Sequence, residues 1–269
     1  MTVSIITVVY NGADTIAEAI ESVLGQTYPH IEYIIIDGAS TDGTQAIVAR
    51  YGGQVSQFIS EPDGGLYDAM NKGISRATGD VIGILNADDL YQNTEVISRV
   101  VALLEQQKAD AVYGDLVYAQ RNAPDKITRY WQAGTYKLGA FLRGWMPPHP
   151  TFFVRSSVYR QYGYFTTILR SAADYELMLR FIHKHQIRVA YLNQVLVVMR
   201  LGGVSNSSLF NRLRANREDR IAWQMNGMRP GWLTLWLKPL RKISNSGNEI
   251  CRPFDRHPLK INQLNLSLT

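Results

Sequence analysis

The sequence of 269 residues predicts an α/β fold built around a mostly parallel sheet. Short β-branched runs alternate with helical patterns over residues 3–115, and this alternation is the signature of βα units. Acidic or small polar residues follow the apolar runs, at the strand ends where open α/β sheets bind ligands. We therefore expect one α/β domain over residues 1–205, with a ligand site at one edge of its sheet, and a basic, amphipathic helical tail over residues 206–269.

The first strands and helix are predicted at the N-terminus. Val3–Val9 is a β-branched run that predicts the first strand, and residues 16–24 place apolar side chains at helical spacing. Thr15 and Glu18 have the spacing of a capping box at the start of this helix. Ile31–Asp37 predicts the second strand, so the chain begins as a βαβ unit.

Further units follow in the same order up to residue 115. Short apolar runs predict the next strands at Gln57–Ser60, Val81–Leu85 and Ala111–Tyr113. Apolar residues at helical spacing predict helices over residues 40–51, Leu66–Ala77 and residues 97–104. Because strands and helices alternate throughout, we expect residues 1–115 to form a nucleotide-binding half.

The pattern is looser over residues 116–205, which we expect to shape the site of the second substrate. Residues 122–125 predict a hairpin turn, and the Pro-Pro-His-Pro run at 147–150 predicts a stiff loop. Asp174–His185 predicts another helix, and Val189–Arg200 predicts a pair of strands.

Cysteine content and charge exclude several classes of protein. Cys251 is the only cysteine, which excludes a disulfide framework and favours the cytoplasm. The N-terminal apolar run is broken too early for a signal peptide, and no apolar stretch approaches the roughly 18 residues of a membrane span. Residues 203–269 hold 11 Lys and Arg against 4 Asp and Glu, whereas residues 1–202 hold 17 against 19. Because the body is not basic, we expect no nucleic-acid partner.

The most informative motif is Asn86-Ala87-Asp88-Asp89, which directly follows a predicted buried strand. Paired carboxylates on a turn suit a hard divalent cation, which takes its other ligands from phosphate oxygens and water. The alternative interpretation is a helix cap or a solvated turn. The motif therefore predicts a metal-diphosphate site, provided that other strand ends supply further ligands.

Other strand ends do carry such groups, at Asn11-Gly12, at Asp37 and in the run Glu61–Gly65. In a parallel sheet these ends share one edge, so residues distant in sequence converge there. Asp37 is placed to accept the ring N–H of a pyrimidine base, and Gly64 and Gly65 allow close approach of the backbone to a ligand. The alternatives are a helix cap for Asp37 and an ordinary turn for the glycines.

Three spaced motifs together resemble the inverting glycosyltransferases of family two, which have a GT-A fold, a Rossmann-like sheet that binds nucleotide-sugars. The motifs are Ser4–Asn11, Ile36–Thr44 and Asn86–Asp89, and the resemblance covers roughly residues 1–205. Ser60–Gly73 further resembles the branch that builds bacterial surface polysaccharides, including lipopolysaccharide. The tail lies outside the resemblance.

The resemblance implies a role for each acid of the motifs. Asp37 would hold the base, Asp88 would approach the ribose, and Asp89 would coordinate Mn²⁺ or Mg²⁺ on the diphosphate. Ala87 stands where the name of the family's metal motif indicates Asp, a departure that many members share. The matched motifs and their neighbours imply further substrate contacts at Thr7, Tyr10, Asn11, Asp63, Gly65, Asn71 and Lys72.

A glycosyl transfer also needs a base for the acceptor hydroxyl, and the candidates are Asp174 and Glu176. Two positions along a helix differ by roughly 200° in direction, so only one of them faces the cleft. We predict Asp174, because the resemblance aligns it with the last acid of the family's Glu-Asp pair, although Ala173 replaces the acid before it. A single base implies direct displacement with inversion, and the alternative for Asp174 is a helix cap.

Two further residues are predicted to contact substrate. His149 lies between prolines, which would aim its ring at the acceptor or the diphosphate, although a structural histidine fits equally. Arg200 precedes a glycine-containing loop able to close over phosphates, and the alternative is a solvated arginine on a surface loop.

The sequence therefore predicts an inverting, metal-dependent glycosyltransferase that moves a sugar from a UDP-sugar to a lipid-linked or growing surface glycan. One rival is a polyprenyl-phosphate sugar synthase, whose acceptor needs no deprotonation, and another is a non-catalytic nucleotide-sugar-binding partner in an assembly complex. A dehydrogenase is disfavoured because no Gly-x-Gly-x-x-Gly follows the first strand.

The tail combines basic residues with Trp223, Trp232 and Trp236, and Leu209–Met228 predicts a long helix within it. Apolar and aromatic residues beside Lys and Arg suit an anionic membrane surface, so residues 209–243 predict peripheral attachment to the cytoplasmic leaflet. The alternative is that these apolar residues pack on the catalytic domain.

Overall fold

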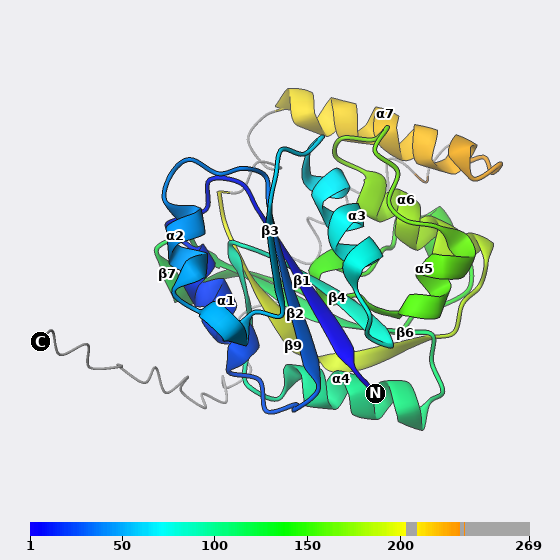
Figure 1. Ribbon diagram of the computed structural model, residues 1–269. Coiled ribbons are helices and arrows are strands. Elements are labelled where there is room, and N and C mark those ends of the chain that lie inside the picture. The colour runs from blue at the N-terminus through cyan, green and yellow to red at the C-terminus, as the bar shows by residue number, and fades with distance from the viewer. Residues whose placement is uncertain (203–208, 232–233, 235–269) are drawn as a thin grey trace, which may run out of the picture.

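Figure 1 shows the computed structural model, which describes residues 1–202, 209–231 and 234. The parallel part of the sheet holds the strands predicted from the N-terminal half: β1 (Val3–Val9), β2 (Ile31–Asp37), β3 (Gln57–Ser60) and β4 (Val81–Asn86). Helices follow these strands as predicted: α1 (Ile16–Leu24), α2 (Thr44–Ala49), α3 (Leu66–Arg76) and α4 (Val96–Gln106). A 3₁₀ turn, η1 (Gly52–Gln54), leads into β3.

The second half adds strands in both directions: β5 (Asp89–Tyr91), β6 (Ala111–Gln120), β7 (Ala123–Trp131), β8 (Phe153–Arg155) and β9 (Val189–Arg200). Its helical segments are η2 (Ala140–Arg143), η3 (His149–Thr151), α5 (Ser156–Tyr162), α6 (Ala173–Met178), the π-helical η4 (Leu179–Lys184) and α7 (Leu209–Met225). Within the described residues the sheet has nine strands in the order β3-β2-β1-β4-β8-β6-β9-β5, with β7 paired to β6.

The register of the parallel strands brings their carboxyl ends to one level. Val9 on β1 pairs with Asp37 on β2, Asp37 pairs with Ser60 on β3, and Val8 pairs with Asn86 on β4. The loops that leave these four strands therefore begin side by side, as the sequence predicted.

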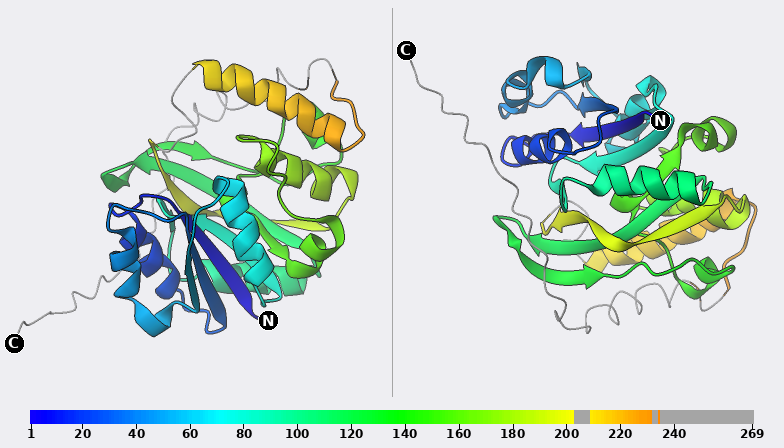
Figure 2. Two further views of the ribbon diagram at one scale, coloured as in Figure 1. Left: turned by 45° about the horizontal axis from the view of Figure 1, so that its top comes forward. Right: turned by 90° about the horizontal axis from the view of Figure 1, so that it is seen from below.

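Helices cover both faces of the sheet (Figure 2). One core lies between the sheet and α1, α2 and α4, and the other lies between the sheet and α3, α5 and α6. The strands are almost continuously buried, because helices cover the parallel sheet on both faces.

The predicted strand pair at Val189–Arg200 is wrong, because the segment forms the single strand β9. Gly114 of β6 pairs with Leu192, and the next residue, Asp115, pairs with Val195. The polar Asn193 and Gln194 are thus taken up as a bulge in one strand, where the sequence pattern indicates a turn between two.

The predicted capping box at α1 is also wrong. Thr15 occupies the N-cap but makes no side-chain cap hydrogen bond, and its hydroxyl donates to the carbonyl of Gly12 at 3.5 Å. Glu18 pairs with Arg200 from the end of β9. Glu18 therefore binds Arg200, which is distant in sequence, and does not cap the start of α1 as the local pattern predicted.

The described part of the tail packs on the domain. Helix α7 lies against α6 (Figure 1), and Trp223 is fully buried between them with its indole N–H donating to the hydroxyl of Tyr175 at 2.9 Å. Trp232 and Trp236, on which the membrane prediction also depends, lie outside the described residues. Among the helices of the described part of the chain, none combines the length and apolar character needed to cross a bilayer.

Candidate active site

The loops after β1, β2 and β3 touch one another at Gly38. A Cβ added there would lie 2.6 Å from Oδ2 of Asp63 and 3.3 Å from Cδ2 of Tyr10. Glycine is required because the two neighbouring loops leave no room for a side chain. The close approach shows that Asp63 and Tyr10 belong to one cluster, in which the Tyr10 side chain is 70% exposed and open to a ligand.

Asp37 lies beneath this cluster and is fully buried. Its carboxylate accepts hydrogen bonds from the backbone N–H of Ser40 at 3.0 Å, from the Ser60 hydroxyl at 2.6 Å and from the Ser40 hydroxyl. Buried carboxylates need such partners to offset the loss of hydration. In this structure Asp37 therefore ties the loop after β2 to the end of β3.

Asp88 and Asp89 differ sharply in exposure. Asp89 opens β5 and is fully buried, whereas Asp88 is partly exposed. Burial, together with the charge of Asp88, raises the pKa of Asp89 well above its usual value, although Asn86 and Arg200 oppose the shift. The side-chain amide of Asn86 donates to Oδ2 of Asp89 at 2.9 Å.

Two oxygens of this turn suit a hard cation. Among the described residues, neither Oδ1 of Asn86 nor Oδ1 of Asp89 has a hydrogen-bond partner, although both atoms are buried. A divalent cation would pair with these buried oxygens and would stabilise the ionised form of Asp89, whose pKa is raised by burial. No group of three His, Cys, Asp or Glu side chains with metal-binding geometry occurs in the described part of the chain, so a cation here would need oxygens from a ligand or water as well.

Arg200 is directed into the protein. Its side chain is only 2% exposed, pairs with Glu18 on α1 and acts electrostatically on Asp89. The arginine that the sequence places near phosphates is therefore, in this structure, part of the charge balance around Asp89. Residues 203–208 of the predicted closing loop lie outside the described residues.

The candidate base Asp174 lies at the start of α6 and faces two partners. The Tyr67 hydroxyl donates to Oδ1 at 3.3 Å, and Nδ1 of His149 lies 3.3 Å from Oδ2. The side chains of Asp174 and His149 are 17% and 26% exposed, so both remain reachable from solvent. Burial lowers the pKa of His149, and the nearby Asp174 opposes this shift.

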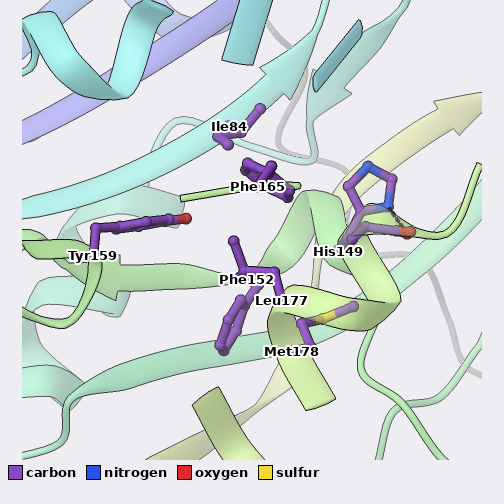
Figure 3. A pocket seen from close by; sticks show the side chains of 8 residues that line it. Ile84, His149, Phe152, Tyr159, Phe165, Leu177 and Met178 are labelled. Carbon is purple, nitrogen blue, oxygen red and sulfur yellow. Dashed lines mark ion pairs between the residues drawn. The ribbon is translucent and has the colours of Figure 1, made fainter. Parts of the chain in front are cut away.

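A small, mostly apolar pocket adjoins this pair (Figure 3). Besides Asp174 and His149, its lining is formed by Ile84, Phe152, Tyr159, Phe165, Leu177 and Met178. Ile84 lies on β4, two residues before Asn86, so the same strand reaches both the pocket and the acidic turn.

Glu176, the other candidate base, is directed away from this pocket. It is 3% exposed, and Arg180 donates to both of its oxygens, at 2.9 and 3.0 Å. Asn226, in the turn directly after α7, donates to it as well, at 2.9 Å. The two acids therefore diverge from one helix turn, and Asp174 is the one beside the pocket.

Several residues of the matched motifs hold loops in place. Thr7 is buried in the sheet and accepts from the Tyr33 hydroxyl at 3.1 Å, and Asn71 exchanges two hydrogen bonds with the backbone of Phe165 at 2.8 and 2.9 Å. Lys72 bonds to the carbonyl of Pro62 at 2.8 Å and to Glu61 at 3.0 Å.

The turns around the site are held by local bonds of the same kind. Asn11, at φ 50°, accepts from the backbone of Thr41 at 2.9 Å. Gly65, at φ 113°, donates to Asp63 at 2.8 Å and starts α3. Each of these residues shapes the rim of the site in this structure.

Sequence reasoning missed Tyr67 and the contribution of α7. Tyr67 follows Gly64-Gly65 at the start of a helix, and this position at the rim of the predicted site was the signal available. Nothing in the local pattern indicates that Ser171, Tyr175 and Glu176 bind partners on a helix, or in the turn after it, some 50 residues later.

Comparison with known proteins agrees with this architecture. Residues 4–165 match glycosyl transferase family 2. An uncharacterized glycosyltransferase of Mycobacterium tuberculosis is 33% identical over 185 residues, covering 66% of this chain and 68% of the relative. A PGL/p-HBAD biosynthesis glycosyltransferase of Mycobacterium bovis is 28% identical over 209 residues, covering 76% and 79%.

Solved structures share the fold. S. aureus TarS 1-349 in complex with UDP-GlcNAc superposes with a TM-score of 0.67 at 18% identity, covering 91% of this chain and 73% of that chain. The mannosyltransferase PcManGT from Pyrobaculum calidifontis, in complex with GDP-Man and Mn²⁺, gives a TM-score of 0.63 at 20% identity, covering 90% and 70%. The family match, the relatives and the fold agree, and this chain belongs to the GT-A glycosyltransferases of family 2.

Proposed function

We propose that this glycosyltransferase moves a sugar from a UDP-sugar to a hydroxyl group of a lipid-linked or growing surface glycan, with inversion at the anomeric carbon. The observation that carries the proposal is Asp174, a carboxylate held beside a pocket by Tyr67 and His149 within a family 2 sheet. The UDP-GlcNAc complex of TarS supports the class of donor.

In this proposal Asp174 is the general base. Its carboxylate accepts the proton of the acceptor hydroxyl while that oxygen attacks the anomeric carbon, and the bond to the diphosphate breaks with its electron pair on the leaving oxygen. A positioned base contributes about 10²- to 10⁴-fold to the rate. Tyr67 and His149 hold the carboxylate toward the pocket, and direct displacement inverts the sugar carbon.

We also propose Mn²⁺ or Mg²⁺ at the Asp88-Asp89 turn, where buried oxygens of Asn86 and Asp89 are left without partners among the described residues. Asp88, the more exposed acid, is the one that a ligand entering from solvent meets first. A bound cation supplies Lewis-acid stabilisation of the charge on the diphosphate. The Mn²⁺ complex of PcManGT supports this choice.

The test uses water as the acceptor, because hydrolysis needs the same base and no acceptor has to be identified. A panel of UDP-sugars is screened for thermal stabilisation with Mn²⁺, and the best donor is assayed for hydrolysis with Mn²⁺ and with chelator. Asp174→Asn should lower turnover about 10²- to 10⁴-fold without weakening donor binding. The matched control is Asp125→Asn, at an exposed position on β7.

Each rival predicts a different result. A polyprenyl-phosphate sugar synthase would keep substantial transfer to polyprenyl phosphate after Asp174→Asn, because a phosphate acceptor is already ionised. A non-catalytic partner would be stabilised by the donor but would release no sugar. Inversion is read from the anomeric configuration of the first product by NMR, and a retained configuration would contradict the single-base mechanism.

We further propose that the enzyme works at the cytoplasmic face of an anionic membrane, where a lipid-linked acceptor is presented. The exposed side of α7 and the turn after it carry Arg217, Arg220 and Arg229, whereas Ala222 and Trp223 face the domain. Basic residues on one side of a docked helix suit anionic headgroups.

A further inference from the structure

We propose that helix α7 fixes the position of Asp174 by binding the residues on both sides of it, so that Glu218 and Trp223 are positioning residues for the transfer. The inference rests on the role of Asp174 as base under the proposed function. It assigns a catalytic contribution to a helix that lies beyond residues 4–165, the part of the chain that the family match covers.

Three contacts join α7 and the turn directly after it to the segment that carries Asp174. Oε2 of Glu218 accepts from both the backbone N–H and the hydroxyl of Ser171, each at 2.8 Å. Trp223 donates to the hydroxyl of Tyr175 at 2.9 Å, and Asn226 donates to Glu176 at 2.9 Å. The contacted residues lie three positions before and one and two positions after Asp174.

The three side chains that reach the Asp174 segment are buried, whereas their partner Ser171 is exposed. Glu218, Trp223 and Asn226 are all buried, with Trp223 only 1% exposed. A hydrogen bond to a charged group contributes more to stability than one between neutral groups, and burial removes water that would compete for the donor and the acceptor. The bonds of Trp223 and Asn226 are therefore buried, and those of Glu218 to Ser171 are partly buried.

The Asp174 segment needs such external support. Helix α6 has six residues before it passes into the π-helical η4, and its N-cap residue, Ala172, makes no side-chain cap hydrogen bond. Short helices without a cap fray at the end where Asp174 lies. The contacts of Asp174 with Tyr67 and His149 are made by its carboxylate and do not involve its backbone.

The network also reaches the pocket wall. Arg180 bonds to Glu176 and donates to the carbonyls of Gly163 at 3.1 Å and Tyr164 at 2.7 Å. The next residue, Phe165, lines the pocket beside Asp174. Helix α7 thereby supports the base through Ser171 and Tyr175. Asn226, directly after the helix, supports the pocket wall through Glu176 and Arg180.

The test compares variants that remove a bond with variants that keep it, using the full chain and the hydrolysis assay. Trp223→Phe removes the indole donor but keeps an aromatic ring, and Glu218→Ala removes the acceptor of Ser171. Each should lower kcat about 10- to 100-fold, the effect of a misplacement of about 1 Å, with KM for the UDP-sugar unchanged. Glu218→Gln retains an acceptor oxygen and should restore most of kcat.

The control is Gln224→Ala, an exposed residue of the same helix, which should keep the wild-type kcat. Ser171→Ala removes the hydroxyl bond from the other side and keeps the test decisive if Glu218→Ala does not fold. If these variants keep the wild-type kcat while Asp174→Asn loses it, the role of α7 is overturned. If Asp174→Asn itself keeps kcat, the proposed base is what fails.

Discussion

At the residue scale, His149 combines burial with a neighbouring carboxylate. The ring is only 26% exposed and lies 3.3 Å from Asp174, and burial has the larger effect, so the pKa of His149 is lowered from 6.5. Neutral imidazole is therefore the form that the folded protein favours near neutral pH. In this form the ring brings no positive charge to the Asp174 carboxylate.

The lowered pKa of His149 predicts a loss of stability in acid. Below about pH 6.5 the unfolded chain binds a proton at this histidine, whereas the folded protein does not until its lower pKa is reached. The folded protein is therefore most stable above about pH 6.5, and its stability falls as the pH drops from there through the folded pKa of His149. Asparagine does not titrate at this position, so the melting temperature of His149→Asn should fall less than that of wild type between about pH 7.5 and 5.

Melting curves of both proteins at several pH values measure this difference. The pKa values of His183 and His185 are also lowered by burial, and their contributions cancel because both proteins retain them. Equal losses of melting temperature in the two proteins would contradict the prediction.

At the element scale, the site is a junction of loops that leave neighbouring parallel strands. The loops after β1 and β3 both pack closely at Gly38, because Asp63 and Tyr10 would lie 2.6 and 3.3 Å from a Cβ added there. The strand register sets the loops side by side, and the missing side chain lets them touch.

Gly38→Ala should push these loops apart. The new Cβ would lie 2.6 Å from Asp63, and overpacking of this kind costs about 1–3 kcal/mol of unfolding free energy. Because Tyr10 and Asp63 form the rim of the proposed donor site, KM for the UDP-sugar should rise as well.

Gly53→Ala is the matched control for this change. A Cβ at Gly53 meets no atom within 4 Å in the described part of the chain, so the same substitution should leave both stability and KM close to wild type. The comparison requires chemical denaturation and donor kinetics of the two variants. Identical behaviour of both would show that the loops are not tightly packed at Gly38.

At the scale of the whole molecule, charge is segregated between the body and the tail. The 17 basic residues of positions 1–202 are balanced by 19 acidic ones, whereas the excess of basic charge lies beyond residue 202. Helix α7 belongs to the basic region, docks on the body through Trp223 and exposes arginines to solvent. A truncation before α7 would remove buried contacts, so surface substitutions are the informative change.

The triple variant Arg217→Gln, Arg220→Gln, Arg229→Gln should bind anionic vesicles more weakly than wild type. Each arginine near such a surface contributes about 1 kcal/mol, and the loss should disappear at high salt. Co-sedimentation with vesicles of phosphatidylglycerol and phosphatidylcholine, against phosphatidylcholine alone, measures the effect.

The control removes the same charge elsewhere, with Arg50→Gln, Lys108→Gln and Lys126→Gln, all exposed positions outside α7. Equal binding by the two triple variants would contradict a membrane-facing role for α7. Weaker binding by the α7 variant alone would support it.

The sequence alone determined the βα order, the strands β1 to β4 and the acids at their ends. Alternating apolar runs and helical spacing are local signals, and parallel strands place their carboxyl ends together whatever their distance along the chain. Together with the resemblance of three spaced motifs to family two, these features predicted a GT-A glycosyltransferase, which the family match and the fold confirm.

Only the tertiary structure decided which side chains face the pocket and which are held inside the protein. Asp174 and Glu176 are equivalent by residue type, but Arg180 and Asn226 bind one of them and leave the other beside the pocket. Arg200 pairs with Glu18 across 182 positions of sequence, and α7 holds the segment around Asp174 from about 50 positions away. The direction of a polar side chain depends on partners brought near by folding, and no local pattern of residues contains that information.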